Sequence, residues 1–174
     1  MNLHAEMTDA ADAAARTVDH VRPAQFGDPT PCPEWDVRTL LNHLILWTSY
    51  SAERRAHGES VSEELMAKDF AAEPDFAADY RAQLDRALAA WADPAAWERD
   101  LNVMGTPTPA ADVASLLLAE LVLHAWDLAA GTGQSYTVGD KAAEAALTAV
   151  AADAPVLDRV LALSGRDPAW TPAG

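Results

Sequence analysis

The chain has 174 residues and carries 12 lysines and arginines against 27 aspartates and glutamates, for a formal net charge of −15. An acidic chain repels phosphate backbones and anionic lipid, so we expect neither nucleic acid nor a membrane surface among its partners. A chain of this length buries roughly two-thirds of its unfolded surface without disulfides, so we expect one domain over residues 1–174, in which a bound metal would serve function rather than folding.

The first predicted helix spans residues 5–21 and places Ala10, Ala14 and Val18 on one face. A stiff, proline-rich connection follows, with the sequence PAQFGDPTPCPEW. It contains the one cysteine of the chain, Cys32, which excludes an internal disulfide and fits a reducing compartment. Because no histidine stands beside Cys32 in the sequence, we interpret it as a small buried packing residue rather than a nucleophile.

The second predicted helix begins after Asp36, a favourable N-cap, and runs to about His57, where Gly58 supplies a C-terminal stop. Its apolar face consists of Val37, Leu40, Leu41, Leu44 and Thr48. Residues 58–72 form a polar loop with a weak helical tendency, and Pro74 opens a third helix. The apolar face of the third helix, in steps of three or four residues, is Phe76, Tyr80, Leu84, Leu88 and Trp91.

The second half of the chain begins with a connector over residues 93–107, which includes a short extended piece from Leu101 to Met104. Thr108 as N-cap and Pro109 as first helical residue then open a fourth helix, which ends near Gly131.

Shorter elements complete the predicted fold. They are a fifth helix over residues 139–152, a sixth over 155–163, and an irregular tail from about residue 165 to 174. The expected fold class is therefore all-α, an antiparallel four-helix bundle with additional short C-terminal helices.

Residues 110–130 of the fourth helix are almost apolar enough to cross a membrane. Asp112, Glu120, His124 and Asp127 would each be costly in hydrocarbon, so we expect instead a buried helix of a soluble protein. The N-terminus also lacks the basic start and continuous apolar core of a secretory signal, and we expect a cytoplasmic protein.

The polar residues of this helix share one line along it. At 100° per residue, with Glu120 at zero, His124 lies at about 40° and Asp127 at about 340°. Toward the N-terminus the line continues through Leu116 and Leu117, so we expect it to face the core. A buried carboxylate needs a partner, and a divalent cation would satisfy Glu120 and a neutral His124 together, because residues four apart lie side by side.

A third ligand has to come from another helix. His43 lies at the edge of the apolar face of the second helix, whereas His4, His20 and His57 are expected at the surface. The residues alone leave two interpretations open: a metal site of His43, Glu120 and His124, or a hydrogen-bonded core or dimer seam without metal.

Three segments resemble the metal-binding N-terminal domain of mycothiol-dependent maleylpyruvate isomerases, in particular short actinobacterial members within the DinB/YfiT-like superfamily. They are TPCPEWDVRTLLNHLILW (residues 30–47), ELVLHAWDLAAGTGQ (120–134) and GRDPAWTP (165–172). The resemblance implies a DinB-like bundle in which His43, Glu120 and His124 bind a divalent metal, usually zinc and in some members nickel or iron. The isomerases have a second, smaller domain, so maleylpyruvate isomerisation itself is not the expected reaction here.

The resemblance also implies a reaction class. The metal would hold a low-molecular-weight thiol, such as mycothiol, against a small electrophilic substrate, which makes the protein a thiol-dependent S-transferase or isomerase. The alternative is a non-catalytic metal-site bundle that binds a small ligand or a protein partner. A homodimer is compatible with the sequence.

Four further residues are candidates for the site. We expect Asp127 to accept a hydrogen bond from a ligand imidazole or to steer a proton, unless it bonds nearby backbone or an arginine instead. Trp47, Tyr50 and Arg54 follow His43 by 4, 7 and 11 residues, so they are expected to line a substrate pocket in which Arg54 meets a carboxylate. The competing interpretation makes Trp47 a core residue and Arg54 a solvated one.

Overall fold

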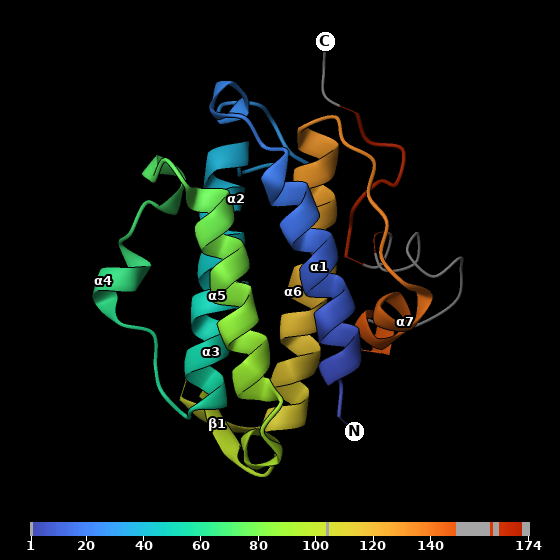
Figure 1. Ribbon diagram of the computed structural model, residues 1–174. Coiled ribbons are helices and arrows are strands. Elements are labelled where there is room, and N and C mark those ends of the chain that lie inside the picture. The colour runs from blue at the N-terminus through green and yellow to red at the C-terminus, as the bar shows by residue number, and fades with distance from the viewer. Residues whose placement is uncertain (1, 104, 149–160, 162–163, 172–174) are drawn as a thin grey trace.

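The computed structural model describes residues 2–103, 105–148, 161 and 164–171, and it is mostly helical. Four rods form the bundle (Figure 1). They are α1 (His4–Asp19), a second rod composed of α2 (Val37–Ile45), η2 (Leu46–Tyr50) and α3 (Ser51–Ala56), then α5 (Phe76–Trp91) and α6 (Ala110–Gly131). The predicted all-α bundle is therefore confirmed.

Shorter elements surround the rods. On one side lie α4 (Glu63–Met66) and the 3-10 turn η3 (Phe70–Ala72), and on the other lies α7 (Asp140–Thr148), which packs on α1 and α6 (Figure 1). Two further 3-10 turns are η1 (Pro23–Gln25) and η4 (Pro94–Trp97). The end of the predicted fifth helix, beyond residue 148, falls outside the described residues, and so does the predicted sixth helix, 155–163, except for Leu161, which is helical and buried.

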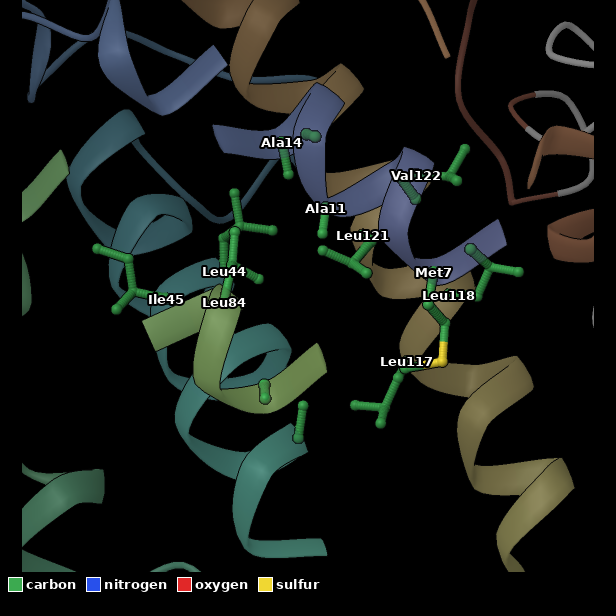
Figure 2. Close-up of a cluster of buried hydrophobic side chains, with 14 of the residues drawn as sticks. Met7, Ala11, Ala14, Leu44, Ile45, Leu84, Leu117, Leu118, Leu121 and Val122 are labelled. Carbon is green, nitrogen blue, oxygen red and sulfur yellow. The ribbon is translucent and has the colours of Figure 1, made fainter. Parts of the chain in front are cut away.

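The core lies between the inner faces of the four rods. Figure 2 shows side chains from α1, α2, α5 and α6 meeting there. The labelled residues are Met7, Ala11, Ala14, Leu44, Ile45, Leu84, Leu117, Leu118, Leu121 and Val122, all buried. The alanines of α1 allow its backbone to approach α6 closely, so these two helices pack along each other.

The second rod is one continuous helix with a π-turn in its middle. It starts where predicted, with the Asp36 side chain accepting a hydrogen bond from the Thr39 N–H at 2.8 Å. In η2 the Thr48 and Ser49 hydroxyls donate to the carbonyls of Leu44 and Ile45, both at 2.6 Å. Such bonds compete with the regular helical pattern, and a π-turn inserts one extra residue into the rod.

A short antiparallel hairpin precedes α6, formed by β1 (Asp100–Val103) and β2 (Thr106–Pro109). The extended piece was expected, but the predicted cap was wrong. Thr108 pairs with Leu101 inside the hairpin, and the helix begins at Ala110 with Pro109 as its N-cap. Because Thr108 is paired within the hairpin, it cannot cap the helix, and the helix starts further along the chain, at Ala110.

The helix α6 runs through the bundle core. It is long and apolar enough to cross a membrane, with a mean hydropathy of 1.6, yet 78% of that window is buried by the protein itself. It is thus the core helix of a soluble fold. The prediction that its polar line continues a buried face was only partly right: Leu116 is 47% exposed and the Glu120 side chain 40% exposed, while His124 and Asp127 are buried.

Truncating a core residue of α6 should cost far more stability than truncating a surface one. Leu121→Ala removes a 2% exposed side chain between α1 and α2, and we expect a loss of about 2–5 kcal/mol in the free energy of unfolding. Leu116→Ala, on the outer side of the same helix, should stay within about 0.5 kcal/mol. Urea denaturation with an unchanged m-value measures both, and equal losses would contradict the packing described.

Candidate metal centre

Three donor side chains from two helices converge on one point. His43 comes from α2, and Glu120 and His124 come from successive turns of α6. The Glu120 Oε2 atom lies 2.8 Å from His43 Nε2 and 3.2 Å from His124 Nε2. One ligand atom from each residue lies within 4.8 Å of the other two, so the group is compact enough to surround a single ion.

The two imidazoles are sheltered and the carboxylate faces outward. The His124 and His43 side chains are 10% and 22% exposed, compared with 40% for Glu120. The indole of Trp35 covers both rings, with centroid distances of 4.5 Å to His43 and 5.5 Å to His124. The most exposed side of this donor group is therefore that of Glu120.

The electrostatics of the site favour a cation. Burial alone would raise the pKa of Glu120, but the hydrogen bonds from His124 and His43 outweigh it and hold that pKa below its ordinary value. Burial alone would lower the pKa of His124, but the hydrogen bonds to Asp127 and Glu120 raise it to about 11. Two carboxylates thus enclose one buried imidazole, a place where positive charge is stabilised.

A second cluster shares His124 and lies behind it. The Asp127 Oδ2 atom is 3.0 Å from His124 Nδ1 and 3.2 Å from the Cys32 sulfur. Arg166 grips the same carboxylate, with its Nε 2.7 Å from Oδ1 and its Nη2 2.6 Å from Oδ2. The interpretation of Cys32 as a buried packing residue was wrong, because its half-buried thiol lies in this polar group.

The two clusters differ in their fitness for a metal. Cys32, His124 and Asp127 also lie within 4.8 Å of one another. However, the Arg166 guanidinium already neutralises Asp127 and stands 3.4 Å from the Cys32 sulfur, where it would repel a second cation. Among the described residues, no guanidinium is hydrogen-bonded to His43 Nε2, Glu120 Oε2 or His124 Nε2, and Arg166 approaches His124 only at the other ring nitrogen, Nδ1, at 3.5 Å. Two imidazoles with one carboxylate suit zinc and related ions.

The structure brings Trp47 to the site but takes Tyr50 and Arg54 elsewhere. The Trp47 ring centroid lies 6.3 Å from that of His43. Tyr50 stacks on Phe70 at 5.1 Å. Arg54 pairs with Glu59 at 3.2 Å, and with Tyr50 it lines a separate hollow of about 880 Å³.

The π-turn explains this displacement. Its extra residue rotates the direction of every later side chain in the rod by one residue position. Arg55 therefore lies on the face where a regular helix would place Arg54. The Arg55 guanidinium lies 5.7 Å from the centroid of the Trp47 ring. Burial lowers the pKa of Arg55, and the negative charge of Glu120 acts against that effect. Arg55 is therefore close enough to interact electrostatically with Glu120.

The other histidines lie away from this cluster. His20 and His57 are exposed, as predicted. His4 is half-buried rather than at the surface, because its Nε2 atom lies 2.9 Å from the Leu88 carbonyl oxygen.

A hollow of about 380 Å³ opens beside His124. The segment from Pro31 to Trp35 forms one wall and residues 164–166 form the other. The hollow is large enough for a small organic molecule and reaches the site through the imidazole of His124.

Residues 7–129 match the mycothiol maleylpyruvate isomerase N-terminal domain. The chain belongs to this family. Its curated relatives include two uncharacterized proteins from two strains of Mycobacterium tuberculosis, each 30% identical over 133 residues. These alignments cover 72% of this chain, which spans only 65% of the length of those relatives.

Solved structures show the family fold. The crystal structure of the mycothiol-dependent maleylpyruvate isomerase matches with a TM-score of 0.63 and 22% identity, covering 86% of this chain and 68% of the isomerase. A mutant of the same enzyme matches with a TM-score of 0.64. The bundle of this chain therefore has the fold of the family.

Sequence reasoning missed four residues around the centre: Trp35, Arg55, Cys32 and Arg166. Three of them stand in the segments that carried the family resemblance, which was a usable signal. The sequence carried no signal for Arg55, because its position beside the site depends on a π-turn that apolar periodicity does not predict.

Proposed function

We propose that His43, Glu120 and His124 hold one divalent metal ion, with zinc as the first candidate and nickel or iron as alternatives. The observation that supports this most strongly is the convergence of three donor groups from two helices on one sheltered point. Two imidazoles and one carboxylate leave coordination positions vacant, which is typical of catalytic rather than structural zinc sites.

We further propose that the protein is a thiol-dependent S-transferase or isomerase. A metal held here would supply Lewis acidity, lowering the pKa of a bound low-molecular-weight thiol so that the reactive thiolate is present at neutral pH. Mycothiol is the first candidate for that thiol, because the name of the family contains it. The proposed thiol co-substrate and the single cysteine support our proposal that the protein works in a reducing cytoplasm.

The proposed reaction begins with attack of the thiolate on an electrophilic carbon of an unsaturated carbonyl compound. A sulfur–carbon bond forms, and the π electrons move onto the carbonyl oxygen to give an enolate. Protonation at carbon by solvent then yields a thioether, the S-transfer product. In the enolate, rotation about the former carbon–carbon double bond, followed by return of the electrons from oxygen and expulsion of the thiolate, instead yields the cis–trans isomer.

The surrounding residues have separate tasks in this proposal. Trp35 shields the two imidazoles from water, since its ring lies against both. Arg55 provides a half-buried cation near Glu120 and Trp47, where it can meet the carboxylate of an anionic substrate. It takes over the role expected of Arg54.

A second candidate function is a metal-holding bundle that binds a small ligand or protein partner without turnover. One observation favours it: this chain aligns with only 68% of the isomerase chain, so groups in the remainder of that enzyme have no counterpart among the aligned residues.

Thiol consumption distinguishes the two functions. We expect zinc-loaded protein to consume mycothiol in the presence of a maleyl compound at least about tenfold faster than metal-free protein, because lowering a thiol pKa from about 8.5 toward 7 raises the thiolate fraction by about that factor. His20→Ala, at an exposed histidine, should keep the full rate. If loaded and metal-free protein consume thiol equally slowly, the protein is a binder rather than an enzyme.

A further inference from the structure

The GRDPAW stretch folds back onto the metal centre from outside the region that matches the family. The family match ends at residue 129, whereas this stretch covers residues 165–170. Gly165 turns the chain with a φ of 79°, and the Arg166 N–H donates to the Leu161 carbonyl at 2.7 Å. These contacts direct the Arg166 side chain toward α6.

Arg166 forms a two-pronged ion pair with a carboxylate that has no access to solvent. Its Nε and Nη2 atoms donate to the two oxygens of Asp127 at 2.7 and 2.6 Å. The Asp127 side chain is 0% exposed, and that of Arg166 is 13% exposed. Two parallel bonds fix the plane of the carboxylate as well as neutralising its charge.

The same carboxylate orients a proposed metal ligand. Asp127 Oδ2 lies 3.0 Å from His124 Nδ1, so Nδ1 carries the hydrogen and Nε2 is directed to the other side of the ring. On that side, Nε2 lies 3.2 Å from Glu120 and the ring stands 4.7 Å from that of His43. A continuous chain of contacts therefore runs from Arg166 through Asp127 to the metal-binding nitrogen.

We propose that Arg166 is a positioning residue for the metal centre, acting through Asp127 on His124. The proposal rests on the metal site described under the proposed function. Without the guanidinium, a buried carboxylate would turn toward other donors, and the imidazole would lose the partner that fixes its tautomer and orientation. A lysine would restore the charge but not the two parallel bonds.

Cobalt(II) binding tests this proposal, because the visible spectrum of the bound ion reports its geometry. For Arg166→Ala we expect the dissociation constant to rise about 10–100-fold, with an altered absorption band. Arg166→Lys should fall between Arg166→Ala and the unaltered protein. Arg81→Ala serves as the matched control, since it removes a surface guanidinium that pairs with Asp19 at 2.5 Å, and should leave both readouts unchanged.

The outcomes separate this proposal from the metal site itself. If the unaltered protein binds no cobalt, the metal site is wrong. If it binds cobalt and Arg166→Ala binds with the same affinity and spectrum while only its stability falls, Arg166 is merely structural and this proposal is overturned. Should Arg166→Ala not fold, the spectrum and affinity of Arg166→Lys decide by the same criterion.

Discussion

Replacing His124 with alanine should remove most of the metal affinity of the protein. Four-ligand zinc sites contribute about 10–16 kcal/mol, so one ligand accounts for roughly 3–4 kcal/mol, a loss of about 10²–10³-fold in affinity. His43→Ala should cause a loss of the same order, because both imidazoles adjoin the same Glu120 oxygen. Competition against a chromophoric chelator measures these affinities.

The control for this prediction is another histidine of the same chain. His20 is exposed, and its Nδ1 lies 2.8 Å from the carbonyl of Arg16 on its own helix. His20→Ala should therefore bind zinc like the unaltered protein. If the unaltered protein binds no metal and His124→Ala only unfolds more easily, then the cluster is a hydrogen-bonded core, the alternative that the residues alone left open.

Removing the carboxylate of Asp127 should destabilise the metal-free protein by about 3–5 kcal/mol, the usual result of breaking a buried ion pair. The loss arises because Arg166, with only 13% of its side chain exposed, keeps its charge and loses its partner. Asp127→Ala is the variant, and urea denaturation of metal-free protein is the measurement. Using metal-free protein separates this effect from any change in metal affinity.

Two further variants make that prediction specific to the buried pair. Asp19→Ala breaks an ion pair whose partners are 37% and 43% exposed, and should cost no more than about 1 kcal/mol. The double variant Asp127→Leu, Arg166→Met replaces the pair with apolar groups and should regain most of the lost stability. A loss below about 1 kcal/mol in Asp127→Ala would show that the pair is not buried in solution.

The parts of the fold that depend on local pattern could be predicted from the sequence. The period of apolar residues located the four rods, and the Asp36 side chain caps the second rod as expected. Helix phase alone predicted that His43 would lie near Glu120 and His124, because each of these three residues lies within a few residues of a buried apolar position on its helix. A cap or a helix face depends on neighbours in sequence, which is why such predictions succeed.

Other features depend on contacts or distortions that no local pattern encodes. Because the π-turn contains one extra residue, Arg55 rather than Arg54 lies beside the site. Arg166 lies 39 residues from Asp127 in sequence, so the return of its segment could not be inferred from periodicity. Leu116 was assigned to the core face, but this position in the N-terminal half of α6 is 47% exposed, because periodicity does not show which side of a largely apolar helix meets solvent.

In the proposed site, His43, Glu120 and His124, and not Cys32 with Asp127, surround the metal. X-ray absorption at the zinc edge of protein loaded with one equivalent, without added thiol, tests it directly. We expect nitrogen and oxygen neighbours at about 2.0–2.1 Å, imidazole scattering from two histidines, and no sulfur. A sulfur neighbour near about 2.3 Å, or a failure of the protein to retain zinc, would contradict it.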